Sequence, residues 1–184
     1  MNRQVITLAV VLSVSAASAQ ANEWELLPIL GDSYQFNPSV ALIGGSVDFK
    51  DGNKINTGGV ELSIDCPLLK PPHHTIRQQI SYSTTDDNGV ETSSFELNPH
   101  HMFNFSNKLQ VGAGPSLGFT KVDTGTNDDT VFTYGVGASA KYNFTQNLFL
   151  GAEVRHAWSD DVDLGGQTSE LENTRALAKI GYQF

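Results

Sequence analysis

Apolar and polar side chains alternate strictly over long stretches of the second half of the chain. From Phe132 to Phe144, every second residue is apolar, whereas the residues between them are polar or glycine. Because successive side chains of a β-strand point to opposite faces, this stretch predicts a strand with one apolar and one polar face. Aromatic residues stand near both ends of the apolar face, with valine and alanine between them. That order is expected of a barrel strand with lipid outside and a polar lumen inside.

Eight segments show this alternation, less regularly in the first half of the chain. They are Ser39–Phe49, Gly58–Asp65, Thr75–Thr84, Ser93–Phe105, Leu109–Phe119, Val131–Phe144, Leu148–Trp158 and Ala176–Phe184. Each is near the ~9–11 residues that a tilted strand needs to cross a membrane. The pattern predicts an all-β fold, an eight-stranded antiparallel up-and-down transmembrane β-barrel over residues 39–184. Proline cannot donate a hydrogen bond to the ladder, so Pro115 is expected to mark a β-bulge.

The connections between these segments fall into two alternating sets. Four are polar and rich in turn residues, and three lie between them. The first set is Lys50–Asn56, Thr85–Glu91, Asp123–Thr130 and Ser159–Arg175; the second is Cys66–Pro72, Ser106–Lys108 and Thr145–Asn147. Long outside loops that alternate with short periplasmic turns are the known asymmetry of such barrels, and an even strand number places both termini on the periplasmic side.

The first 21 residues predict an export signal. Arg3 supplies a positive charge, Val5–Val14 is a short and mostly apolar run, and small residues follow up to Ala21. This order is typical of a cleaved signal peptide, and the apolar run is too short to cross about 30 Å of hydrocarbon. We therefore expect a signal peptide over residues 1–21, an N-terminal periplasmic segment over residues 22–38, and the barrel after it.

Composition narrows the range of possible folds and partners only a little. The formal charge of −9 argues against nucleic acid as a partner, because duplex binding relies on Lys and Arg at the phosphates. The single cysteine, Cys66, excludes an internal disulfide and is expected to be an incidental buried or turn residue. With 39% hydrophobic residues, a soluble periplasmic β-barrel stays open as the alternative fold.

The last strand carries a family resemblance. The ending "ALAKIGYQF" resembles the closing strand of bacterial outer-membrane β-barrel proteins, and "FLGAEVRHAWSDDVDLGG" is similar to the penultimate strand and last extracellular loop of OmpA/OmpX-like, porin-family small barrels. The resemblance implies the outer membrane of a Gram-negative bacterium, with its lipid and lipopolysaccharide as surroundings. It also implies that the barrel-assembly machinery recognises the outward aromatics Tyr182 and Phe184. We expect a monomer.

The predicted lumen is rich in charge. Its carboxylates are Asp48, Glu61, Asp65, Glu96 and Glu153, and its bases are Arg77, Lys141, Arg155 and Lys179. An eight-stranded barrel is only wide enough for side chains to fill, and buried charges require partners. The interpretation we prefer is a paired network that plugs the barrel, with a selective pore as the alternative. Glu153 and Lys179 fall on neighbouring strands and are the first pair to test.

Two pairs of adjacent histidines raise the question of metal binding. They are His73-His74 and His100-His101, each preceded by proline. Imidazole is a common metal ligand, but adjacent residues of an extended strand point to opposite faces. Neither pair can chelate from one side, so we expect interfacial or turn histidines, with no metal and no cofactor.

A hydrolytic site is a further hypothesis. His156, Ser159 and Glu170 could supply the base, the nucleophile and the orienting acid of ester hydrolysis. The resemblance adds that lipid A deacylases are eight-stranded barrels with such a trio near the outer leaflet. Their His and Ser are two residues apart on one strand face, however, whereas these two are three apart. We therefore expect a polar loop that begins at Ser159.

Three functions follow, and we rank them in order. The first is a non-enzymatic integral barrel with a structural or surface-exposed role and a lumen filled by side chains. The second is a narrow porin-like channel for small solutes. The third is a lipid A deacylase-like enzyme at the outer leaflet.

Overall fold

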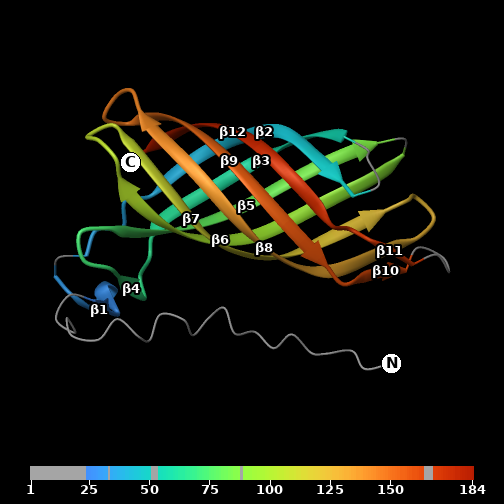
Figure 1. The fold of residues 1–184 in the computed structure, drawn as a ribbon, viewed down its shortest axis with the longest axis horizontal. Helices are drawn as coiled ribbons and strands as arrows, with labels where there is room; N and C mark the ends of the chain where they lie inside the picture. Colours follow the sequence, from blue (N-terminus) through green and yellow to red (C-terminus); the bar gives the residue numbers. More distant parts are fainter. Residues whose placement is uncertain (1–23, 33, 51–53, 88, 164–167) are drawn as a thin grey trace.

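The chain forms a closed antiparallel β-barrel of eight strands, in the order β12-β2-β3-β5-β6-β7-β8-β9 (Figure 1). The computed structural model describes residues 24–32, 34–50, 54–87, 89–163 and 168–184, the side chains of 161–170 excepted. The predicted signal peptide over residues 1–21 lies outside the described residues. The predicted fold class is confirmed, since strands adjacent in the barrel are also consecutive barrel strands in the chain, and β12 closes the cylinder against β2.

The eight barrel strands are 11 to 16 residues long. They are β2 (Ser39–Phe49), β3 (Lys54–Asp65), β5 (Thr75–Asp87), β6 (Val90–Asn104), β7 (Leu109–Asp123), β8 (Asp128–Asn143), β9 (Leu148–Ser159) and β12 (Asn173–Gln183). Two small sheets lie beyond the barrel strands: β1 (Glu25–Leu26) pairs with β4 (Leu69–Lys70), and β10 (Asp161–Asp163) pairs with β11 (Thr168–Glu170). No helix among the described residues is long and apolar enough to cross a membrane.

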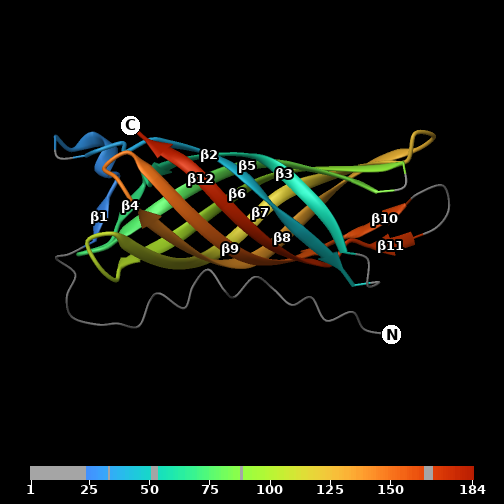
Figure 2. The ribbon, with the colours of Figure 1, turned by 90° about the horizontal axis from the view of Figure 1, so that it is seen from above.

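The connections at the two ends of the barrel differ in length from those predicted. The end with β1, β4 and the C-terminus is called the terminal end, and the end with β10 and β11 is called the loop end (Figure 2). Strands reach much further towards the loop end than predicted, because the polar residues there continue the ladder. Thus β7 and β8 pair up to Asp123 and Asp128, and β5 and β6 up to Asp87 and Val90. The longest connection at the terminal end, from β3 to β5, contains β4.

The outward face carries a continuous apolar belt. Outward leucine, valine, isoleucine and aromatic side chains are exposed in the isolated chain and alternate with mostly polar inward ones, except on β2, whose buried inward row includes Ala41, Ile43 and Val47. Aromatics mark the edges of the belt. Phe132 and Tyr142 of β8 are ten residues apart, which at ~3.4 Å per residue and a tilt of about 40° spans roughly 26 Å. That height matches the ~25 Å apolar band of transmembrane barrels.

Cross-strand contacts define the aromatic girdle nearer the loop end. Phe119 and Phe132 meet with ring centroids 5.6 Å apart, and Tyr134 stacks on Trp158 at 5.9 Å. At the terminal end, Tyr182 contacts Phe184 at 5.1 Å. Such rows stabilise a sheet through paired side chains on one face and hold aromatic rings at the depth where lipid headgroups begin.

The expected bulge at Pro115 is wrong. On both sides of that position, β6 and β7 keep one register, with Leu97 opposite Leu117 and His101 opposite Ala113. Pro99 falls opposite Pro115 between these pairs, so two residues that lack an N–H face each other. The ladder is interrupted over these rows without an extra residue in either strand. Proline is accommodated here by a gap in the pairing instead of a bulge.

An arginine at the middle of the belt should destabilise the protein strongly. Val154 of β9 is 57% exposed and lies between the two girdles. Val154→Arg is expected to lower the free energy of unfolding by about 2–4 kcal/mol, because the charge would enter hydrocarbon. Urea unfolding in phospholipid vesicles measures it.

The matched control is Thr130→Arg, on an exposed position of β8 near the loop end. It should cost no more than about 1 kcal/mol, since the penalty falls near the interface. Equal costs at the two positions would mean that Val154 does not face lipid.

Candidate functional site

The lumen gathers the charged side chains that the polar strand faces carry. Glu96 of β6, Glu153 and Arg155 of β9, and Arg175 and Lys179 of β12 are all buried. They come from distant parts of the chain, and the barrel brings them together because each occupies the inward face of its strand. The lumen is therefore the part of the molecule where a function could be built.

These groups form one network of ion pairs in which basic and acidic side chains alternate. Arg175 and Arg155 both donate to Oε2 of Glu96, over 2.8 and 2.6 Å. Arg155 also donates to Glu153. On the other side of this carboxylate lies Lys179.

At its two ends, this network of ion pairs contacts further strands of the barrel wall. Lys179 donates to Glu61 of β3 and to Oε1 of Gln79 of β5, the latter over 3.2 Å. Arg175 finishes the other end with bonds of 3.2 Å to Ser94 and 3.0 Å to Asn173. The series of contacts thus joins β3, β5, β6, β9 and β12 across the lumen.

This network of ion pairs is electrically balanced. Its three carboxylates, Glu61, Glu96 and Glu153, face three bases, Arg155, Arg175 and Lys179. The transfer of an ion from water to the protein interior costs several kcal/mol, unless oppositely charged partners with good geometry offset that cost. Because every charge in this set has an opposite partner, the network is consistent with a dry, closed lumen.

Glycines on the facing strands make room for these long side chains. A Cβ at Gly118 of β7 would lie 2.7 Å from Cγ of Glu96, and one at Gly137 of β8 would lie 3.2 Å from Nε2 of His100. The inward faces of β7 and β8 therefore form a thin wall that the side chains of β6 overlie. This explains why the polar faces of those two strands consist largely of glycine and small residues.

Little space remains beside the network. One lumen cavity of about 30 Å³ lies among residues that include Glu61, Lys141 and Lys179, and another of about 10 Å³ lies near Arg175. A water molecule needs roughly 10–15 Å³ of such space. Cavities of this size have room for only a very few water molecules and form no open passage for solutes.

A second set of charges lies nearer the terminal end. Arg77 pairs with Asp65 at 2.9 Å and donates to the carbonyl oxygen of Asn37 and to Ser39. Lys141 donates to Oε1 of Gln183 over 2.7 Å, and its Nζ lies 4.4 Å from the ring centroid of Phe149. These contacts fill the lumen from the main network towards the terminal end.

The structure places the predicted lumen residues as follows. Glu61, Glu96, Glu153, Arg155 and Lys179 meet in the main network, while Arg77 and Lys141 lie nearer the terminal end. The placement of Asp48 is wrong, because this residue is exposed on the outward face of β2. Both faces of β2 are rich in apolar residues, so the pattern did not fix which side turns inward.

Arg175 was not among the predicted lumen residues. It was expected in the loop Ser159–Arg175, whereas β12 begins at Asn173 and turns Arg175 inward. The alternation with Leu177 and Lys179 was the signal that could have found it. His100 was expected to be an interfacial or turn histidine, and that expectation is wrong: the residue is fully buried in the lumen and shares a hydrogen bond of 2.7 Å between Nδ1 and Oγ of Ser139.

His100 and His101 split between the two faces of β6, as alternation requires, whereas His73 and His74 precede β5. His100 lies in the lumen, whereas His101 lies outside and stacks on Phe103 at 4.5 Å. His73 occupies a turn with φ of 60°, and His74 contacts His101 at 5.4 Å. Among the described residues, no group of three or more His, Cys, Asp or Glu side chains could hold a metal ion.

The proposed hydrolytic trio is not assembled. His156 lies on the outward face of β9, where Nδ1 meets Oγ1 of Thr174 at 2.9 Å and Nε2 lies 3.6 Å from Glu172. Ser159 belongs to the inward row, and its Oγ accepts a bond of 2.9 Å from the N–H of Leu171. The odd spacing puts the two on opposite faces. The side chain of Glu170 lies outside the described residues.

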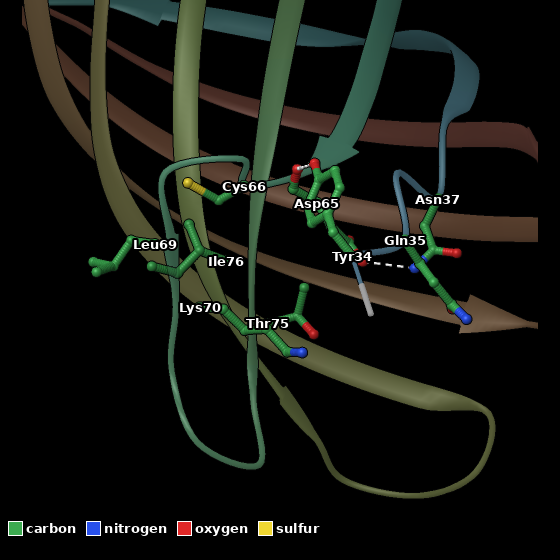
Figure 3. Close-up of a pocket in the computed structure, with 9 residues that line it drawn as sticks. All are labelled: Tyr34, Gln35, Asn37, Asp65, Cys66, Leu69, Lys70, Thr75 and Ile76. Carbon is green, nitrogen blue, oxygen red and sulfur yellow. Dashed lines mark hydrogen bonds between the residues drawn. The ribbon is translucent and has the colours of Figure 1, made fainter. Parts of the chain in front are cut away.

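A pocket of about 310 Å³ opens at the terminal end, where residues of the N-terminal segment meet the end of β3 and the β4 connection (Figure 3). Tyr34 donates to the carbonyl oxygen of Asp65 over 2.6 Å. Burial, with the charge of Asp65 adding to it, raises the pKa of the Tyr34 hydroxyl. Cys66 is buried here and accepts a bond from Nε2 of Gln78 over 3.3 Å. Its thiol is thus a packed and bonded group of this rim.

Comparison with known proteins agrees with this architecture. The chain matches the family described as "Outer membrane protein beta-barrel domain" over residues 6–184. No curated protein matches it. Solved structures of similar fold include the following three, each at low sequence identity.

Neisserial surface protein A (NspA) has a TM-score of 0.54 and 16% identity, with 81% of this chain and 97% of that chain covered. The N-terminal β-barrel domain of Pseudomonas aeruginosa OprF has a TM-score of 0.55 and 18% identity, covering 82% and 100%. The attachment invasion locus protein Ail of Yersinia pestis has a TM-score of 0.51 and 12% identity, covering 82% and 100%.

At such identities the likeness establishes the fold, while the family match covers nearly the whole chain. The location follows from the family and agrees with the apolar belt and its aromatic girdles. The chain belongs to the outer membrane protein beta-barrel family, and it is an integral barrel of the outer membrane.

Proposed function

We propose that the protein is a non-enzymatic structural barrel that contributes to envelope integrity and presents its loop end outwards. The observation that carries the proposal is the balanced chain of ion pairs across the lumen, from Arg175 to Glu61. A conducting pore needs a hydrated path, and this network of ion pairs fills the cross-section of the lumen instead. The small cavities beside it support the same reading.

The two alternatives have less support. A narrow channel requires that ion pairs such as Glu153–Lys179 open, which leaves charges without their partners. A lipid A deacylase requires a nucleophile beside His156, and the hydroxyl that meets this histidine belongs to Thr174 instead of Ser159. If the protein is a non-enzymatic barrel, as we propose, its overexpression leaves lipid A acylation unchanged.

The proposed partners are lipids and the barrel-assembly machinery, with the protein itself monomeric. Lipopolysaccharide surrounds the loop end, where carboxylates such as Asp86, Glu91 and Asp128 are exposed. Divalent cations prefer carboxylate oxygens and would bridge this surface to lipopolysaccharide phosphates. One Ail structure contains a heparin analogue, sucrose octasulfate. The exposed carboxylates do not favour such a polyanion here.

Loss of the central base should destabilise the barrel. Lys179→Met leaves Glu61 and Glu153 without a shared partner, and an unpaired buried charge costs about 3–5 kcal/mol. Urea unfolding in vesicles measures the loss. Lys50→Met is the control: this lysine pairs with Glu172 at the surface, and such pairs contribute about 0–1 kcal/mol. Similar small losses for both variants would show that the lumen is hydrated.

A closed lumen predicts electrical silence. Purified protein in planar bilayers should give no stable single-channel steps, because side chains fill an eight-stranded barrel. A trimeric porin added to the same membrane is the positive control. Reproducible steps that change when Glu153 or Lys179 is neutralised would establish the channel function and reject the proposal.

The final aromatics should matter for assembly. Tyr182 and Phe184 face outwards at the terminal end, and Phe184 is 70% exposed. Phe184→Ala is expected to reduce the amount of folded protein in outer membranes several-fold. Phe105→Ala removes a phenylalanine of similar exposure from the same end and should not reduce this amount. Heat-modifiable gel mobility measures both, and equal effects would assign Phe184 only a lipid contact.

A further inference from the structure

An apolar surface outside the barrel is largely uncovered in the described structure. We call it the N-terminal apolar surface, and it consists of Trp24, Leu26, Leu27, Ile29, Leu30 and Leu68. Leu26 is 76% exposed and Leu30 81%. These residues belong to neither the barrel wall nor its lumen. Contiguous exposed apolar side chains on this scale mark a site of interaction.

The segment that carries this surface is held in one conformation. β1 pairs with β4, the N–H of Leu27 donates to the carbonyl of Leu68 over 2.8 Å, and the single turn Pro28–Leu30 follows. Leu27 has φ of 52°, in the left-handed region that side chains other than glycine rarely adopt. The surrounding hydrogen bonds keep it there, and the result is that leucine and isoleucine side chains project outwards.

The charged side chain that lies within this surface is paired with an opposite charge. Glu25, which lies between two of its members, pairs with Lys70 at 3.5 Å. The N–H groups of Leu27, Ile29 and Leu30 each donate to a backbone carbonyl. Satisfied backbone donors lower the cost of entering a medium poorer in water than the bulk.

The surface continues the lipid-facing wall. The ring of Trp24 meets that of His101 edge-on, with centroids 6.5 Å apart, and His101 stacks on Phe103. Phe103 is exposed on the outward face of β6, at the terminal edge of the belt. Figures 1 and 2 both place β1 and β4 at that end, and Figure 1 shows them outside the outline of the barrel. The N-terminal apolar surface is thus contiguous with a face that already contacts lipid.

We propose that the N-terminal apolar surface is an interfacial anchor that enters the leaflet at the terminal end, with Trp24 at the headgroup level. Its occupant is phospholipid. Tryptophan is enriched at that depth because its ring is apolar while its N–H still reaches a polar partner. The Glu25–Lys70 pair then lies among the headgroups. The anchor fixes the segment against the wall beside β6.

The chain has two tryptophans, Trp24 and Trp158, which makes the test direct. In Trp158→Phe folded into phosphatidylcholine vesicles, Trp24 is the sole tryptophan, and selective excitation of tryptophan avoids the emission of the five tyrosines. Lipid brominated close to the headgroup should quench its emission strongly, and aqueous iodide should quench it weakly. Leu30→Glu in the same background should raise iodide quenching about twofold or more, because a carboxylate draws the segment into water.

The matched control is Trp24→Phe, which leaves Trp158 in the other girdle, beside Tyr134. Quenching of Trp158 by brominated lipid shows that the barrel is inserted, whatever the N-terminal segment does. With insertion shown, iodide access to Trp24 without bromine quenching overturns the proposal. Protection from both quenchers overturns it as well, since a protein partner or a second copy would then cover the surface.

Discussion

Hydrocarbon offers no hydrogen bonds, and that constraint determines the rest of this structure. Every backbone N–H and C=O within the membrane must find a partner inside the protein, so a sheet can cross only if it closes on itself. Pairing of β12 with β2 over eleven rows achieves the closure. Closure then sorts the side chains: one alternate set meets lipid and the other is enclosed. The apolar belt and the charged lumen are therefore two consequences of one condition.

The enclosed set carries charge, and this is what gives the lumen its character. Arg155 sits between Glu96 and Glu153, and Lys179 sits between Glu153 and Glu61. Each charge is acceptable in the interior only because its neighbour is of opposite sign. The thin glycine wall of β7 and β8 gives the long side chains their space. Together these features fill the lumen, and they support a structural role for the barrel better than transport.

Strand number, strand faces and most of the lumen residues could be predicted from alternation, because a period of two is unambiguous where one face is polar. The prediction failed where that contrast is weak. Both faces of β2 are rich in apolar residues, so alternation did not reveal that Asp48 turns outwards. Polar residues at the loop end resemble turns although they continue the ladder, which shortened the predicted strands and hid Arg175. The position of the N-terminal segment depends on pairing between β1 and β4, two short strands far apart in sequence, and carries no periodic signal.

A double-mutant cycle between Glu153 and Lys179 tests the closed lumen most directly. Glu153→Gln, Lys179→Met and the double variant are unfolded by urea in vesicles, and the coupling free energy is the part of their losses that does not add. A dry lumen predicts coupling of about 1 kcal/mol or more, since contacting residues of one network typically couple by ~0.5–3 kcal/mol. Coupling near zero would mean that water screens the pair, and it would contradict the account of a barrel closed by its own charges.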